Sequence, residues 1–301
     1  MTDTGLRIDV EALTREFDAF CRDNPGHKVM GWITEREQEH FLRVIEKRGR
    51  FVSQFEATYE ILVHVAGHVN FGAERREWPG HRAVQFVMTV ENLKPIYSAF
   101  GRLVRGYYED SFALMRIAYE AFFRIVHVSL YPEDSYWSFG PKAKGVKQFQ
   151  LTNFLKDELR LDWTEYKVLS SMAHSYEMTV LRQVVQIGKE GQKEPLGFGF
   201  AYDETTLSVG VNVLRFLLLL YLHVVIRVLL QPRISGVPDQ GLVSKAKKCI
   251  ELYQKDLLSH PDEYWRRAAQ DLDFIFHIIE RAEEGEDWKS FVREVRPEIR
   301  H

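Results

Sequence analysis

This 301-residue chain contains one long apolar segment, Val209 to Leu230, which limits the folds that it can adopt. The segment contains no proline, and it has the length of a membrane-spanning helix, about 20 residues. Four polar side chains interrupt it: Asn212, Arg215, His223 and Arg227. Because charged groups inside a bilayer are costly, these residues favour a helix enclosed by protein. We therefore expect the central helix of a bundle and no membrane partner.

Helical periodicity continues through the rest of the chain, and evidence for strands is minimal. We expect helices near residues 9–22, 34–70, 82–130, 148–159, 164–187, 205–230, 242–259 and 261–284. Thr34 and Glu37 form a capping-box pattern, with Gly49 as a candidate break in the same helix. Pro95 and Gly101 predict a kink or split in the next helix. The predicted fold class is all-α.

Glycine and proline clusters separate these helices into three regions. We expect an N-terminal helical region at residues 1–81 and a helical core at residues 82–232. A C-terminal helical pair and tail, residues 233–301, would pack on that core. For the last expected helix, Pro261 suits the first turn, with Ser259 or His260 as the cap.

Composition excludes several classes of function. Forty Lys and Arg against 43 Asp and Glu give a net charge of −3, so a globally basic, duplex-binding surface is disfavoured. The two cysteines, Cys21 and Cys249, cannot form a disulfide framework or a four-cysteine zinc site. The first residues lack the apolar stretch of a secretory signal, so we expect a cytoplasmic protein. No motif for a cofactor is present, and we expect none.

Two of the expected helices contain polar residues at four-residue spacing. Arg116 and Glu120 share one face of the first, and Ser170 and His174 share one face of the second. An Arg-x-x-x-Glu helix followed by a Leu-Ser-x-x-x-His helix resembles a bacterial family of unknown function that is placed near the HEPN helical domains. The resemblance covers about half the chain, roughly residues 82–230.

The resemblance implies a HEPN-like helical bundle in which Arg116, Glu120, Ser170 and His174 face one another. In this interpretation Glu120 pairs with Arg116 and orients His174 as a general base. The implied partner is RNA or a nucleotide, the implied role is bacterial stress or phage defence, and the implied assembly is a homodimer. The alternative is a protein-interaction module in which the same residues form a structural polar network.

One departure from the family pattern leaves catalysis open. Active HEPN ribonucleases contain Arg-x(4–6)-His, and no arginine stands at that spacing before His174. Pairs with this spacing occur elsewhere, for example Arg22 with His27 and Arg76 with His81, but about as often as chance predicts. The sequence therefore leaves a candidate ribonuclease and a non-catalytic module as alternatives.

Two further groups of residues have a chemical interpretation. Glu60, His64 and His68 follow one another at four-residue steps, and two such histidines can bind a metal if another helix supplies a carboxylate. The motif is incomplete, so we expect no metal. Lys142, Lys144 and Lys147 lie among aromatic residues and could bind single-stranded nucleic acid, although a solvated loop is the simpler interpretation.

Overall fold

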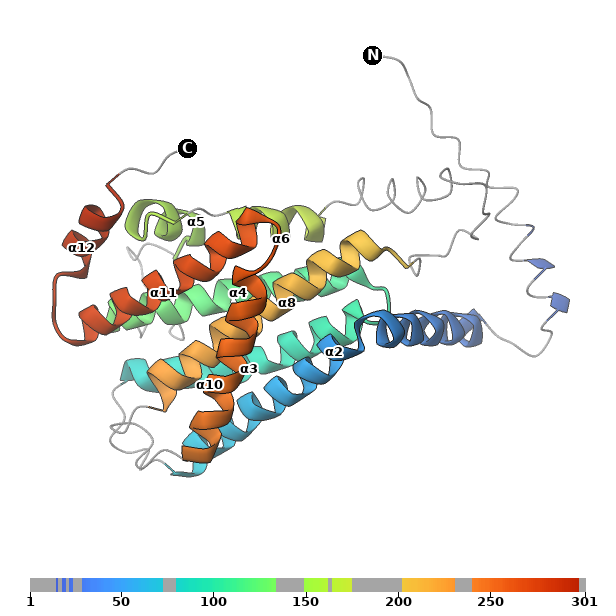
Figure 1. Ribbon diagram of the computed structural model, residues 1–301, viewed down its shortest axis with the longest axis horizontal. Helices are drawn as coiled ribbons and strands as arrows, with labels where there is room; N and C mark the ends of the chain where they lie inside the picture. Colours follow the sequence, from blue (N-terminus) through green and yellow to red (C-terminus); the bar gives the residue numbers. More distant parts are fainter. Residues whose placement is uncertain are drawn as a thin grey trace, which may run out of the picture.

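The computed structural model shows a bundle of packed helices (Figure 1). It describes residues 29–72, 80–133, 149–161, 164–174, 202–230 and 240–297, and five single positions between residues 15 and 23. Within these ranges the regular structure is helical and no strand occurs. The all-α prediction is therefore confirmed. Most of the expected helix at residues 9–22, and the part of the expected helix at 164–187 that follows residue 174, lie outside the described residues.

The bounds of the described helices are α2 Val29–Gly72, α3 Gly80–Leu103, α4 Tyr108–Leu130, α5 Leu151–Asn153 with the π-helix Phe154–Glu158, α6 Thr164–His174, α8 Glu204–Val224 with the π-helix Val225–Leu229, α10 Gln240–Leu258, α11 Glu263–Glu283 and α12 Trp288–Val295. Two of the described helices, α5 and α8, continue directly into a π-helical turn. Helices α3 and α4 form the most extensive pair, and α6 packs along α4.

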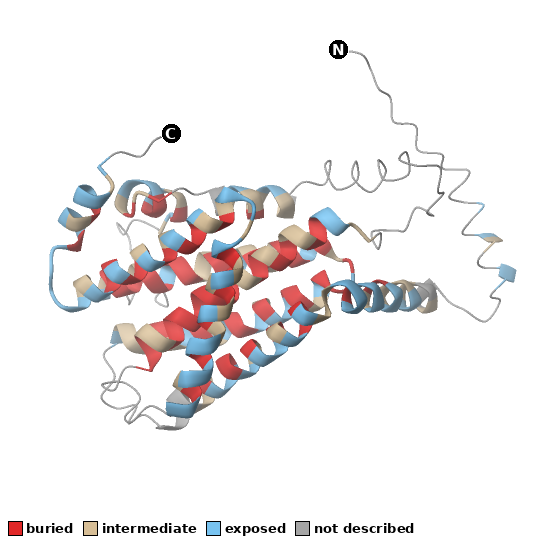
Figure 2. Cartoon of the chain, in the orientation of Figure 1, coloured by how far each residue is buried: buried red, intermediate tan, exposed pale blue. Residues whose placement is uncertain are grey.

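Helix α8 is the apolar segment singled out in the sequence, and it lies inside the bundle. All six side chains at positions 217–222 are fully buried. Helices α2, α3, α4, α10 and α11 contact it, and the buried residues follow the inner sides of these helices (Figure 2). This helix is long and apolar enough to cross a membrane, but 78% of its most apolar window is buried against the rest of the chain. It is the core helix that the sequence predicts.

Residues of all three expected regions contribute to one hydrophobic core. Phe55 of α2 stacks on Phe100 of α3 with ring centroids 3.9 Å apart. Phe122 of α4 lies 6.1 Å from Phe276 of α11. Aromatic pairs of this kind add a modest stabilisation to the burial of the rings themselves. The N- and C-terminal helices therefore share the core of the middle region.

Two predicted helix starts are wrong. Helix α2 begins at Val29, so Thr34 lies inside the helix and is not its cap. Helix α11 is capped by Asp262, whose carboxylate accepts a hydrogen bond from the backbone nitrogen of Tyr264 at 3.0 Å. An aspartate is one of the preferred caps because its short side chain reaches the free amides of the first turn. Neither Ser259 nor His260 has that role.

The predicted interruptions are partly right. Helix α2 has non-helical backbone angles at Arg48 (φ −132°, ψ 22°), one residue before the candidate break at Gly49. Pro95, in contrast, lies within α3, and the chain turns only after Leu103. Gly106 closes this turn with φ +89°, a conformation that favours glycine. A Cβ atom there would come within 3.0 Å of the ring of His40, so the turn also gives space to that histidine.

Candidate functional site

The residues predicted from the Arg-x-x-x-Glu helix form a polar cluster between α4 and α6. Arg116 Nε donates to Glu120 Oε1 at 2.9 Å, and a second guanidinium nitrogen donates to the Tyr166 hydroxyl at 2.9 Å. That hydroxyl in turn donates to Glu120 Oε1 at 3.1 Å. The guanidinium also lies over the Tyr166 ring, 5.1 Å from its centroid. We call Arg116, Glu120 and Tyr166 the α4–α6 cluster.

The α4–α6 cluster is electrostatically balanced. Burial opposes the charge of Arg116, but its hydrogen bond to Glu120 and the proximity of Tyr166 outweigh this, and the pKa of Arg116 is raised. Burial, followed by the nearby Glu120 charge, raises the pKa of Tyr166. The tyrosine therefore stays protonated and remains a donor to the carboxylate. The side chains of Arg116 and Glu120 are 26% and 30% exposed, so the pair lies at the edge of the bundle and not in its centre.

Tyr166 was not predicted, although a signal for it exists. It precedes Ser170 by four residues on α6, so Tyr166, Ser170 and His174 follow one face of that helix. Ser170 is half-buried. His174 ends α6, about 12 Å beyond Tyr166 along the helix axis, and its side chain lies outside the described part of the structure. Helix α6 runs antiparallel to α4 (Figure 1), so the end of α6 lies towards the start of α4.

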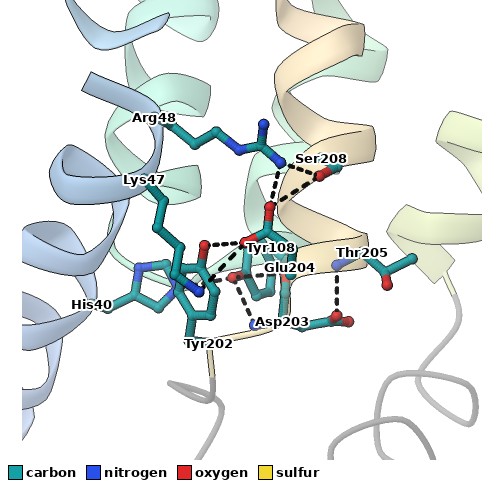
Figure 3. A network of polar contacts seen from close by, with 9 residues as sticks. All are labelled: His40, Lys47, Arg48, Tyr108, Tyr202, Asp203, Glu204, Thr205 and Ser208. Atoms are coloured by element: carbon teal, nitrogen blue, oxygen red, sulfur yellow. Dashed lines mark hydrogen bonds and ion pairs between the residues drawn. The ribbon is translucent and has the colours of Figure 1, made fainter. Parts of the chain in front are cut away.

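A second polar network, which the sequence analysis missed entirely, joins α2, α4 and α8 (Figure 3). His40 is only 2% exposed. Its Nδ1 lies 3.0 Å from the carbonyl oxygen of Val104, and its Nε2 lies 2.8 Å from the hydroxyl of Tyr108. The backbone nitrogen of Asp203 donates to the same hydroxyl at 3.2 Å. We call His40, Val104, Tyr108 and Asp203 the His40 joint.

The contacts of the His40 joint determine which ring nitrogen of His40 carries the proton. The Val104 carbonyl can only accept, so Nδ1 holds the proton, and Nε2 must accept from the Tyr108 hydroxyl. Burial lowers the pKa of His40, partly offset by its bond to the Val104 carbonyl, and burial also raises the pKa of Tyr108. Both groups are therefore neutral near pH 7. Each polar atom in this chain of bonds has a partner, which is the arrangement expected of a structural network.

A charged rim surrounds the His40 joint where α2 bends. Arg48 donates to Glu204 and, at 2.8 Å, to the hydroxyl of Ser208. Lys47 lies over the ring of Tyr202, 4.7 Å from its centroid, and 3.9 Å from Glu204. The Tyr202 hydroxyl also donates to Glu204. The bend at Arg48 is therefore held against the first turn of α8, which Asp203 caps through the backbone nitrogen of Thr205.

A second buried histidine, His223, lacks the hydrogen bonds that His40 makes. His223 of α8 is 4% exposed, and neither ring nitrogen has a hydrogen-bond partner among the described residues. Its ring stacks on Phe276 with centroids 5.0 Å apart. Burial, together with the charge of Arg227, lowers the pKa of His223 to about 4. It is therefore neutral at pH 7 and lies just before the π-helical turn that contains Arg227.

A surface pocket of about 420 Å³ lies beside α11 and the end of α12. Three of its six lining residues are arginines; the lining comprises Glu263, Arg266, Arg267, Gln270, Asp271 and Arg296. Arg296 pairs with Asp271, and Arg266 donates to the carbonyl oxygens of His260 and Pro261 at 2.7 and 3.0 Å. We call it the arginine pocket. Guanidinium groups gathered in this way are suited to phosphate or carboxylate groups.

The remaining predicted residues do not form a described site. Glu60 and His64 are exposed on α2, with His64 Nδ1 4.0 Å from Glu60 Oε1, and the side chain of His68 lies outside the described residues. Among the side chains that the structure describes, no three His, Cys, Asp or Glu residues are grouped as a metal would require. Lys142, Lys144 and Lys147 lie in the segment 134–148, which the structure does not describe.

Comparison with known proteins adds no relative. No family model, no curated protein and no solved structure matches this chain. The described residues therefore define a class only: an all-α bundle with two polar networks between its helices.

Proposed function

We propose that this chain is a non-catalytic helical interaction module whose polar networks hold its helices in register. The observation that supports this proposal most directly is the bonding of the α4–α6 cluster. Arg116, Glu120 and Tyr166 satisfy one another, so the charge of the guanidinium is already neutralised by the carboxylate. A catalytic arginine would need to direct its donors at a substrate instead. The His40 joint is bonded in the same inward manner.

The test separates stability from activity. Glu120→Gln keeps the shape of the side chain but removes the charge that balances Arg116. Because the pair is partly exposed, we expect a loss of about 1 kcal/mol in the free energy of unfolding. Thermal or urea unfolding measures this change. Tyr166→Phe serves as the matched variant, because it removes one hydroxyl of the same cluster and leaves the ion pair in place.

A ribonuclease assay of the parent and of His174→Ala completes this test. The module predicts no RNA cleavage above the level of His174→Ala. Cleavage by the parent that His174→Ala abolishes, with unchanged unfolding, would support the HEPN-like ribonuclease and overturn the module. His174 is the residue to change because it is the candidate general base.

Binding of RNA or a nucleotide is a second candidate function, and the arginine pocket favours it. The HEPN-like resemblance also suggests this partner, along with a role in bacterial stress or phage defence, a cytoplasmic location and a homodimer. Three arginines line one pocket against Glu263 and Asp271, and Asp271 is paired with Arg296. Such a pocket can bind phosphate groups even though the chain has a net charge of −3.

Fluorescence anisotropy with a labelled single-stranded RNA tests this second function. Arg267→Glu should weaken binding about tenfold and reduce the dependence on salt, because fewer counterions are released. Lys247→Glu is the matched control, since it makes the same charge change at an exposed position on α10. Equal weakening by both variants would show general electrostatics and no pocket. Unchanged binding by Arg267→Glu would exclude the pocket as the RNA site.

A further inference from the structure

One side of α4 presents an open stripe that its neighbouring helices leave uncovered. Ile117 at its centre is 51% exposed, an unusual position for an isoleucine in a helix that is otherwise deeply buried. Three half-buried apolar residues extend the stripe along the same face, Ala113, Leu114 and Ala121. The opposite side of α4 packs on α8, where the Tyr221 hydroxyl donates to the Ala118 carbonyl at 3.0 Å. We call this exposed side the Ile117 stripe.

The Ile117 stripe ends in opposite charges. Asp110 lies two turns before Ile117 and Arg124 lies two turns after it, and both are exposed. At 100° per residue, Asp110 and Arg124 each lie about 20° from Ile117 around the helix, on opposite sides of it, so all three share its outer face. Asp110 has one distant intramolecular cation, Arg102, at 3.9 Å. Arg124 lies over the ring of Phe149, 5.7 Å from its centroid.

The positions in the stripe are symmetric about Ile117. If two copies of α4 lie antiparallel with Ile117 at a two-fold axis, Asp110 of one copy is level with Arg124 of the second copy, and the reverse pair forms as well. The same symmetry brings Ala113 level with Ala121 of the second copy. Small residues at these positions let two helices approach closely, and self-complementary patches of this kind define two-fold interfaces.

We propose that the Ile117 stripe is a homodimer interface in which α4 packs antiparallel on α4 of a second copy. The partner is a second copy of this chain, because an antiparallel copy of the stripe places its basic end opposite the acidic end of the first. This inference deepens the proposed interaction module by naming its partner. It fails separately from that proposal, because a monomeric parent would overturn the dimer and leave the unfolding and ribonuclease results unaffected.

Sedimentation velocity of the full chain across micromolar concentrations tests the interface. We expect a dimer for the parent and at least a tenfold weaker dimer for Ile117→Arg, which places two like charges at the two-fold axis. Val63→Arg is the matched control, because Val63 of α2 is 43% exposed and lies outside the stripe. Its dimer should equal that of the parent. A monomeric parent, or an Ile117→Arg variant that still dimerises, overturns the proposal.

Charge reversal tests the antiparallel register itself. Asp110→Arg and Arg124→Asp each place like charges opposite one another twice in the dimer, so each should weaken association about tenfold. The double variant restores both pairs and should dimerise like the parent. Unfolding curves check that each variant keeps its fold. A double variant that remains as weak as the single variants would overturn this register.

Discussion

The two buried histidines, His40 and His223, are almost equally hidden from solvent but differ in their bonding. Both ring nitrogens of His40 are hydrogen-bonded, whereas neither nitrogen of His223 has a partner in the described structure. Burial lowers the pKa of each. Burial alone therefore does not show how much a polar side chain contributes to stability. His40 links three helices, while His223 occupies the space of an apolar residue at the cost of two unbonded nitrogens.

The largest effect should come from breaking the His40 joint. His40→Leu would leave the Val104 carbonyl buried without a partner and would remove the acceptor of the Tyr108 hydroxyl, which keeps its bond from the backbone nitrogen of Asp203. The orphaned carbonyl costs about 1–3 kcal/mol and the lost hydroxyl bond about 1 kcal/mol, so we expect a loss of about 2–4 kcal/mol in the free energy of unfolding. Urea unfolding measures the change. A loss below about 1 kcal/mol would show that the bonds of His40 contribute little and would remove the contrast with His223.

Acidification should destabilise the protein through the core histidine. The pKa of His223 is about 4 in the folded chain, against an ordinary value of 6.5 in the unfolded chain. Between these values the unfolded chain binds a proton that the folded chain does not. The contribution of His223 to the free energy of unfolding is therefore fully present above pH 6.5. It falls as the pH decreases, by up to about 3 kcal/mol at pH 4.

Unfolding free energies measured from pH 7 to pH 4 test this dependence. His40 shifts in the same direction and contributes to the same slope. A variant without His223 separates the two contributions, because the part of the slope that belongs to His223 should vanish in it. An identical slope in that variant would show that His223 is not the group responsible.

Replacing His223 itself should give the opposite sign from replacing His40. His223→Leu removes two unbonded nitrogens from the core and keeps a side chain of similar size. Removing these nitrogens should raise the free energy of unfolding by about 1–2 kcal/mol at pH 7. The lost stacking on Phe276 should offset part of this gain. Thermal unfolding measures it. A loss of stability as large as that of His40→Leu would mean that His223 has a bonded partner.

The sequence predicts the helices better than the networks, and for a physical reason. Helical periodicity and breakers are local, so the all-α class and the buried position of α8 follow from the chain itself. The pair Arg116 and Glu120 is also local, because its spacing is one helical turn. Tyr166 lies at the same spacing from Ser170 and could have been recognised. Its partnership with the pair depends on how α6 packs on α4, which no local pattern encodes.

The His40 joint could not be predicted from the sequence. Its bonds connect His40 with residues 64 and 68 positions away, and Tyr108 with a residue 95 positions away. Only the folded arrangement of α2, α4 and α8 brings them together. The start of α2 fails for a different reason, because Thr34 satisfies the capping pattern but the helix already begins at Val29. A short capping pattern is a weak guide to the residue at which a helix begins.

The smallest effect is expected at the charged rim of the same joint. Arg48→Gln removes the ion pair with Glu204, whose side chains are 36% and 46% exposed. Solvent and salt screen such a pair, so its loss should cost less than about 1 kcal/mol. The variant should also make stability less dependent on salt, because the screened attraction is gone. Urea unfolding at low and high salt measures both changes. The ion pair and the His40 joint both lie between α2 and α8. A cost equal to that of His40→Leu would therefore mean that the ion pair, and not the buried neutral hydrogen bonds, holds α2 against α8.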